Sequence, residues 1–211
     1  MIDHIRLVSI IQEIAVVIKE NKELLTELDQ AIGDGDHGIN LDRGFSAVKE
    51  KLNGLQNKDC GTILNTTAMT LISKVGGASG PLYGTAFMRA GQIVAGKTQI
   101  TEEDAVKMFD AAIQGIVLRG KANKGDKTML DALIPAFEIF KTTIEANEGL
   151  NTAATKAAEA AKEGVEYTKT IAAKKGRASY LGDRSIGHQD PGATSTYLIL
   201  KVVSDFLAKE N

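Results

Sequence analysis

The sequence predicts an all-α domain of about eight helices, with glycine-rich loops that gather at one end. Over most of the chain, apolar residues recur at steps of three and four, which is the spacing of an amphipathic helix. Alternating strands joined by hairpin turns are missing. The glycines are clustered, because 12 of the 21 fall in residues 33–44, 76–84 and 176–192, between helical stretches.

The composition is that of an ordinary globular protein, with 43% hydrophobic and 25% charged residues in 211 residues. We expect one domain over residues 1–211. A net charge of −2 gives no basic footprint for nucleic acid, and no stretch has the ~18 apolar residues of a membrane span. Cys60 is the single cysteine, so no internal disulfide forms, and a reducing cytoplasm is the expected compartment.

The first helix has one apolar face and begins near the N-terminus. Its members are Ile5, Val8, Ile11, Ile14, Ala15 and Ile18. Leu24, Leu25 and Leu28 continue the pattern after a polar break at Asn21. A face this apolar fits either the core or the interface of a homodimer.

The central helices have clear start signals. Asp59 is a helix cap before a periodic stretch that reaches Gly76-Gly77. Thr101 to Asp104 resembles a capping box with Asp in place of Glu, and it precedes another periodic stretch.

Three helices follow in the last third of the chain. Residues 130–146 and 151–173 read as helices, and the second is rich in alanine. Asp190-Pro191 places a cap before a proline at the first helical position, which predicts a last helix through Leu207.

Two motif matches lack the context that their mechanism needs. Residues 91–98 satisfy the P-loop pattern, but helix-like residues precede them and no strand does. Residues 33–38 satisfy the dinucleotide fingerprint, but they also follow a helix, and their two carboxylates would repel a bare pyrophosphate. We interpret the first as a helix end followed by a turn.

Three carboxylates make residues 29–36 a candidate metal site. Asp29, Asp34 and Asp36 lie within eight residues, bent by two glycines, and would repel one another unless a cation lay among them. Carboxylate oxygens suit Mg²⁺, which completes its shell with water and phosphate oxygens. A solvated acidic loop that caps the next helix is an equally good interpretation of this segment alone.

Three further loops have the composition of a phosphate or nucleotide site. Residues 76–81 end one helix and begin another, and a helix N-terminus attracts anions. In the long loop at 174–193, Arg177 or Arg184 is suited to neutralise a transferred phosphoryl group. Residues 120–129 include a methionine and glycines that could frame a nucleobase. Taken singly, a tight turn, a solvated basic loop and an exposed turn are the more common explanations of these three segments.

The sequence shows no recognisable general base. This suggests that a partner supplies both the phosphoryl acceptor and the group that activates it. At these motifs the sequence closely resembles the nucleotide-binding L subunit of bacterial dihydroxyacetone kinases. The shared stretches are residues 33–38, 76–84, 120–122, 125–129 and 176–193.

The resemblance implies an eight-helix closed barrel whose loops at one end hold two Mg²⁺ ions and ADP or ATP. It assigns the metal to Asp29, Asp34 and Asp36, and charge stabilisation to Arg177. It assigns nucleotide contacts to His37, Gly38, Ile39, Asn40, Ala78, Ser79, Gly120, Met129, Arg177, Asp190, Pro191 and Gly192.

The resemblance also implies two partners. One is a K subunit that holds dihydroxyacetone covalently, and the other is a phosphohistidine protein of the phosphotransferase system that rephosphorylates bound ADP. The chain carries no fused K-like domain, which favours this phosphoenolpyruvate-dependent branch over the ATP-dependent one. Two alternatives stay open: an exchanging ATP-dependent kinase subunit for another acceptor, and a nucleotide-loaded regulatory module without turnover.

Overall fold

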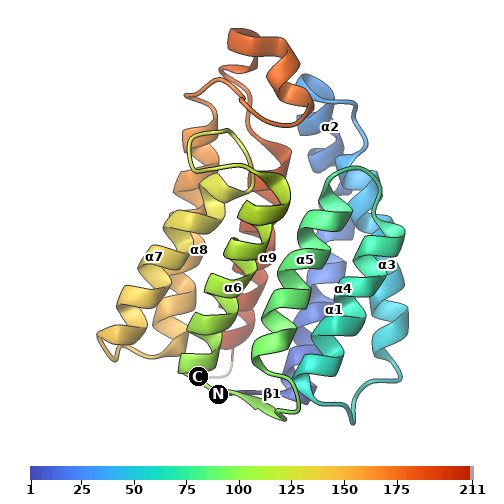
Figure 1. The fold of residues 1–211 in the computed structure, drawn as a ribbon, viewed down its shortest axis with the longest axis vertical. Helices are drawn as coiled ribbons and strands as arrows, with labels where there is room; N and C mark the ends of the chain where they lie inside the picture. Colours follow the sequence, from blue (N-terminus) through green and yellow to red (C-terminus); the bar gives the residue numbers. More distant parts are fainter. Residues whose placement is uncertain (210–211) are drawn as a thin grey trace.

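A computed structural model describes residues 1–209 of the chain, and helices account for most of them (Figure 1). The elements in chain order are β1 (Ile2–Asp3), α1 (His4–Glu20), α2 (Lys22–Ile32), α3 (His37–Leu52), α4 (Cys60–Lys74), α5 (Ser79–Ile93), β2 (Gln99–Ile100), α6 (Glu102–Gly120), α7 (Leu130–Glu145), α8 (Leu150–Thr168), the 3₁₀-helix η1 (Arg177–Ser185) and α9 (Pro191–Ala208). The predicted all-α fold is confirmed.

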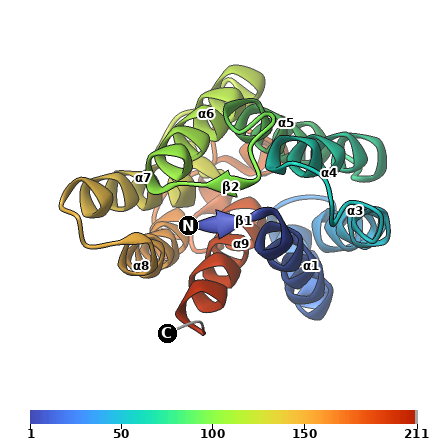
Figure 2. The ribbon, with the colours of Figure 1, turned by 90° about the horizontal axis from the view of Figure 1, so that it is seen from below.

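Helices α1 and α3 to α9 form a closed ring, which is seen from below in Figure 2. Each of α3 to α9 packs on the helix before and after it, and α1 packs on both α3 and α9, which closes the ring. Neighbouring helices of this ring run in opposite directions (Figure 1). The expected barrel of eight helices is therefore present, with α2 and η1 as additional helices at one end.

The predicted helix starts use the predicted caps. The Asp59 carboxylate accepts the Thr62 N–H at 3.1 Å, and the Asp190 carboxylate accepts the Ala193 N–H at 2.7 Å. Thr101 and Asp104 form the reciprocal pair of bonds of a capping box. Local side-chain chemistry thus fixes where α4, α6 and α9 begin.

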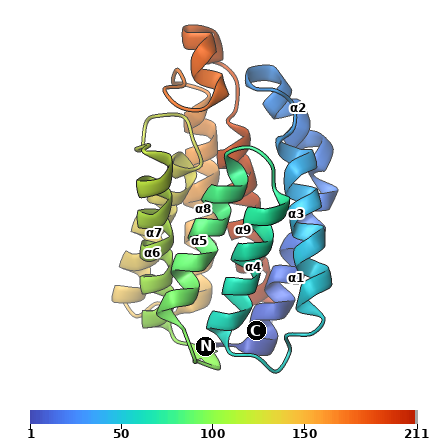
Figure 3. The ribbon, with the colours of Figure 1, turned by 45° about the vertical axis from the view of Figure 1, so that its right-hand side comes forward.

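Three boundaries differ from the sequence prediction. The first apolar stretch is two helices, because Asn21 ends α1 and its side-chain amide donates to the Val17 carbonyl at 2.8 Å. The alanine-rich helix ends at Thr168 rather than at residue 173. The long loop at 174–193 contains the 3₁₀-helix η1, which begins after Gly176. Figure 3 shows α2 and η1 together above the barrel, where they contact each other.

The opposite end of the barrel is closed by a short antiparallel ladder in which Ile2 pairs with Ile100. Strands of two residues carry no periodic signal, so the sequence analysis missed them. The P-loop-like segment lies at this end: α5 ends at Ile93, and the Lys97 ammonium lies 2.6 Å from the Asp104 carboxylate. As expected, it is a helix end and a turn.

The apolar core fills the barrel. The inward face of α1 is buried in this single chain, although Ile5 lies outside it and is exposed. An apolar cavity of about 260 Å³ remains among these helices, lined mostly by aliphatic and aromatic side chains. Within residues 1–209, no helix combines the length and apolar character needed to cross a bilayer.

Candidate functional site

The loops at the α2–η1 end of the barrel enclose a cavity of about 930 Å³. Its walls come from four connections that are far apart in sequence: α2–α3, α4–α5, α6–α7 and α8–α9. Most of the residues predicted to form the site line this cavity: Asp29, Asp34, Asp36, His37, Ala78, Ser79, Gly120, Met129, Arg177, Asp190, Pro191 and Gly192. Helix packing thus brings three of the glycine-rich clusters to one place.

The three predicted carboxylates form one cluster on the wall made by α2 and α3. One oxygen from each of Asp29, Asp34 and Asp36 lies within 4.8 Å of the others. The second interpretation from the sequence also holds in part, because an Asp29 oxygen accepts the N–H groups of Asp36 and His37 at 2.9 and 3.2 Å. Asp29 therefore caps α3, while Asp36 makes no capping bond with its side chain. Three clustered carboxylates form a donor set of the kind that holds Mg²⁺.

The N-terminus of α5 opens into the same cavity. The helix begins at Ser79 with no side-chain cap and no acidic residue in its first turn. Gly77 has φ +64, a left-handed conformation that glycine adopts without strain and that turns the chain into the helix. The free N–H groups and the positive end of the helix dipole are suited to bind an anion.

A buried chain of polar groups joins α3, α5 and α9 beneath the cavity. The His37 ring lies 3.0 Å from the Ser79 hydroxyl through Nδ1 and 2.9 Å from the Ser195 hydroxyl through Nε2. Tyr83 extends the chain, with its hydroxyl 2.8 Å from Ser195 and 3.1 Å from Thr196. Burial lowers the pKa of His37, against the attraction of Asp29 and Asp36, so the ring is neutral. Both of its nitrogens are already hydrogen-bonded.

The cavity is also lined by basic residues. Arg177, at the start of η1, forms an ion pair with Asp34 at a nitrogen–oxygen distance of 2.8 Å. Lys174, Lys175 and Arg119 also line the cavity. Arg184, the other arginine considered from the sequence, is exposed and does not line the cavity. The cavity therefore combines basic side chains with a cluster of carboxylates.

Three predicted site residues do not line the cavity. Ile39 points to solvent with 47% of its surface exposed. Asn40 is buried, accepts a hydrogen bond from Arg43 at 2.6 Å, and lies against Gly76 of the α4–α5 loop. Gly38 faces α2, where a Cβ would lie 2.1 Å from the Lys22 carbonyl oxygen.

The packing of Gly38 predicts a loss of stability on substitution. In the Gly38→Ala variant the added methyl must push α2 away from α3, which costs about 1–3 kcal/mol of the free energy of unfolding. Alanine returns about 1 kcal/mol through its helix propensity, so we expect a net loss of up to about 2 kcal/mol. Gly54→Ala is the matched control, since nothing lies within 4 Å of that Cβ. Urea unfolding of both variants measures the difference, and equal stabilities would contradict the close approach of α2.

The buried carboxyl of Asp190 predicts a pH dependence. Burial raises its pKa to about 7, partly offset by the Ala193 N–H and by Lys127. Between about pH 4, where an unfolded Asp titrates, and pH 7, the folded chain keeps a proton that the unfolded chain has released. The free energy of unfolding therefore falls as pH rises through this range, by at most about 1.4 kcal/mol per pH unit.

The Asp190→Asn variant isolates this effect, since Asn caps helices as well as Asp does. We expect the free energy of unfolding of the variant not to fall in this way. The difference in free energy of unfolding between wild type and variant should therefore change between pH 4 and 7. Urea unfolding at several pH values, without nucleotide, measures it. Parallel stability curves would show that Asp190 keeps an ordinary pKa.

The sequence analysis missed several polar residues of the site. Tyr83, Ser195 and Lys127 are buried beneath or beside the cavity, and each was treated as part of a helix or turn. His37 and Ser195 are 158 positions apart, so no local pattern connects them. The one signal available was compositional, namely three consecutive hydroxyl residues (194–196) on the inner side of an otherwise apolar helix.

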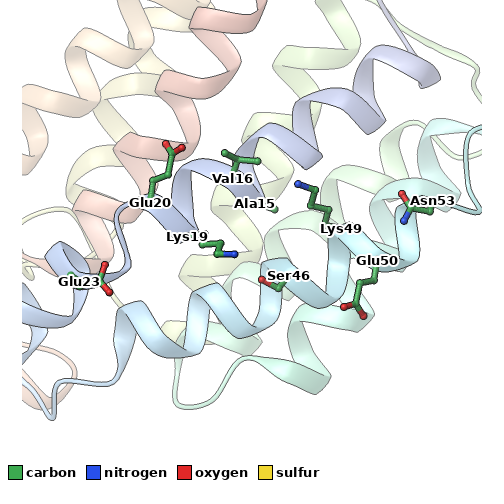
Figure 4. A pocket seen from close by; sticks show the side chains of 9 residues that line it. All are labelled: Ala15, Val16, Lys19, Glu20, Glu23, Ser46, Lys49, Glu50 and Asn53. Carbon is green, nitrogen blue, oxygen red and sulfur yellow. The ribbon is translucent and has the colours of Figure 1, made fainter.

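A second hollow lies outside the barrel, in the groove between α1 and α3 (Figure 4). Its volume is about 730 Å³, and its charged side chains are Lys19, Lys49, Glu20, Glu23 and Glu50. It contains none of the predicted site residues. The cavity above the barrel is therefore the one that combines clustered carboxylates with a free helix N-terminus.

Comparisons with known proteins agree with this geometry. The DAK2 domain model matches residues 31–205. The PEP-dependent dihydroxyacetone kinase, ADP-binding subunit DhaL, of Escherichia coli is 47% identical over 194 residues, which is 92% of each chain. The PTS-dependent dihydroxyacetone kinase, ADP-binding subunit DhaL, of Lactococcus lactis is 40% identical over 191 residues, 90% of this chain and 91% of that one.

A solved structure shares the fold. The dihydroxyacetone kinase from C. freundii, in complex with AMP-PNP and Mg²⁺, superposes with a TM-score of 0.72 at 24% identity. The match covers 94% of this chain but 33% of that longer one. The helical barrel thus also occurs as one part of a larger chain.

Proposed function

The chain belongs to the DAK2 domain family, as an ADP-binding subunit of dihydroxyacetone kinase, and from this premise we propose how its cavity works. We propose that the cavity holds ADP or ATP with two Mg²⁺ ions and transfers the γ-phosphoryl group to dihydroxyacetone on a separate K subunit. One observation carries the proposal: three carboxylates within 4.8 Å of one another share a cavity with the uncapped N-terminus of α5.

The acidic cluster fits the metal part of this role. Asp29, Asp34 and Asp36 would hold the ions, and the ion pair between Asp34 and Arg177 indicates that the cluster attracts positive charge. When bound, Mg²⁺ neutralises the β- and γ-phosphates and aligns them for transfer. Because Asp29 also caps α3, the metal site and the start of that helix share one side chain.

The remaining walls fit the nucleotide. The N–H groups at the start of α5 would bind phosphate oxygens, and the neighbouring Ser79 hydroxyl is held by His37. Gly120 and Met129 line the end of the cavity suited to the base. Arg177 would leave Asp34 for the γ-phosphoryl group and stabilise the charge that spreads over its oxygens during transfer.

The residues lining the cavity offer no free general base. His37 has both ring nitrogens engaged, and the Asp190 carboxyl is buried and caps α9. Activation of the acceptor hydroxyl would therefore fall to the K subunit that carries dihydroxyacetone. The acceptor oxygen attacks the γ-phosphorus of ATP, the bond to the β-phosphate oxygen breaks, and ADP remains in the cavity.

Regeneration of ATP completes the cycle. The names of the E. coli and L. lactis relatives refer to phosphoenolpyruvate and to the phosphotransferase system, which supports a phosphohistidine protein as the donor. Its phosphorus–nitrogen bond breaks as the β-phosphate oxygen of bound ADP takes the phosphoryl group. ADP then acts as a resident carrier of phosphoryl groups rather than as a product.

The first test is to denature the purified protein and quantify released nucleotide and magnesium per chain, with none added. We expect about one ADP per chain, together with magnesium, to survive gel filtration. An empty protein that binds ATP reversibly would instead support the exchanging ATP-dependent kinase. A protein that binds no nucleotide even with Mg²⁺ would overturn the assignment of the cavity.

A further inference from the structure

Lys127 is a buried lysine in the α6–α7 loop, beside the cavity. Its exposed fraction is 1%, and its backbone has φ +60, which is unusual for a residue with a side chain. A charged group is costly to bury unless its hydrogen bonds are satisfied. The contacts of this ammonium therefore indicate why it is there.

The Lys127 ammonium donates to three backbone carbonyls. They belong to Thr168, the last residue of α8, to Ile171 at 3.3 Å, and to His188 before α9. An ammonium has three protons, so all its donors are used. One side chain from the α6–α7 loop thus binds both ends of the long connection between α8 and α9.

Two buried carboxyl groups act electrostatically on Lys127. Asp131 and Asp190 both raise its pKa, whereas burial, the larger effect, lowers it. Asp131 also accepts the N–H groups of Gly125 and Thr128, at 2.6 and 2.7 Å, which fixes the loop on either side of Lys127.

Other hydrogen bonds connect the same segments. The Lys174 N–H donates to the Asp126 carbonyl at 3.0 Å, and the Gly187 N–H to the Lys169 carbonyl at 2.8 Å. The Asp190 N–H donates to the Thr168 hydroxyl at 3.0 Å. Lys127 lies where these segments meet and is the one side chain described that bonds to both ends of the α8–α9 connection.

We propose that Lys127 is a positioning residue for the nucleotide, an internal cation that fixes the Thr128–Met129 and Asp190–Gly192 walls of the cavity relative to each other. The inference rests on the proposed function, because the positioned ligand is the nucleotide. Lys127 precedes Thr128 and Met129 directly, and its His188 bond is two residues from Asp190. Without the ammonium, three backbone carbonyls, of which that of Thr168 is buried, lose their donor, and the two walls lose the side chain that joins them.

The test compares Lys127→Met with Lys97→Met in the full chain. Lys97 is the matched control, because it pairs with Asp104 at the opposite end of the barrel. Fluorescent N-methylanthraniloyl-ADP with Mg²⁺ is the probe, after removal of any bound nucleotide. We expect Lys127→Met to weaken binding by at least about 10-fold, because small displacements of positioned groups are costly, and Lys97→Met to bind like wild type.

Amide hydrogen exchange of the nucleotide-free protein separates positioning from general destabilisation. In Lys127→Met, the amides of Lys174, Gly187 and Asp190 should exchange faster, while those of α1, α3 and α4 keep wild-type protection. Unchanged binding, or loss of protection throughout the barrel, would overturn the proposal. A wild-type protein that binds no probe would overturn the proposed function, and this inference with it.

A chemical variant decides the question if Lys127→Met does not fold. Lys127→Cys, in a Cys60→Ala background, can be alkylated in denaturant and refolded, either with 2-bromoethylamine or with 1-bromopropane. The first restores an ammonium of lysine length and the second gives an uncharged chain of similar shape. We expect tight binding of the probe only with the ammonium, and equal binding by both products would overturn the proposal.

Discussion

We expect replacement of Asp34 by Asn to abolish Mg²⁺-dependent retention of ADP and to leave the helix content unchanged. Loss of a residue that only supports a metal ligand typically costs 10–100-fold in affinity, so loss of a ligand's charge should cost about 100-fold or more. Asp34 is the best of the three carboxylates for this test, because it is exposed and, unlike Asp29, accepts no helix-capping bond.

Asp42→Asn is the matched control for this variant. Asp42 lies on α3, 3.8 Å from Lys22, and outside the acidic cluster. Calorimetric titration with ADP at fixed Mg²⁺, together with far-ultraviolet circular dichroism, measures both effects. If Asp34→Asn kept wild-type affinity for ADP, Asp34 would not be a metal ligand. If both variants lost affinity equally, the cause would be the loss of one negative charge rather than its position.

Replacement of Arg177 by Ala should slow phosphoryl transfer by about 1,000-fold while changing ADP retention by less than about 10-fold. An arginine that meets the charge of a transferred phosphoryl group typically contributes 10³–10⁵ in rate. Both side chains of the ion pair between Arg177 and Asp34 are open to solvent, and such pairs contribute at most about 1 kcal/mol to stability. The variant should therefore fold normally.

Arg184→Ala controls for the loss of an arginine from η1, because Arg184 is exposed and lies outside the cavity lining. Turnover is measured with the K subunit and the phosphohistidine donor, and retention by nucleotide release after denaturation. If Arg177→Ala lost retention and turnover in equal measure, Arg177 would bind the ground state alone. Unchanged turnover would assign the charge stabilisation to another group.

Much of the fold could be predicted because its signals are local. The caps at Asp59, Thr101 and Asp190 act within three residues of themselves, so each predicted helix start agrees with the structure. The break at Asn21 was visible as a polar interruption, but the sequence did not show that it ends the helix.

The site could be predicted in part, for the same reason. Asp29, Asp34 and Asp36 are near neighbours in sequence, and their mutual repulsion is enough to suggest a cation among them. The bonds of Lys127 to His188 and of His37 to Ser195 connect residues 61 and 158 positions apart. Such contacts depend on how α3, α8 and α9 close the barrel, which periodicity within one helix does not determine.

The ladder between β1 and β2 places the start of the chain at the end of the barrel remote from the cavity, and α9 also finishes there (Figure 1). Helix α9 has 18 residues, so it measures about 27 Å along its axis. A second protein that is joined to either terminus would need a linker of roughly eight extended residues to reach back along the barrel to the cavity. Immobilisation by a terminal tag, by contrast, leaves the cavity end of the barrel pointing away from the surface.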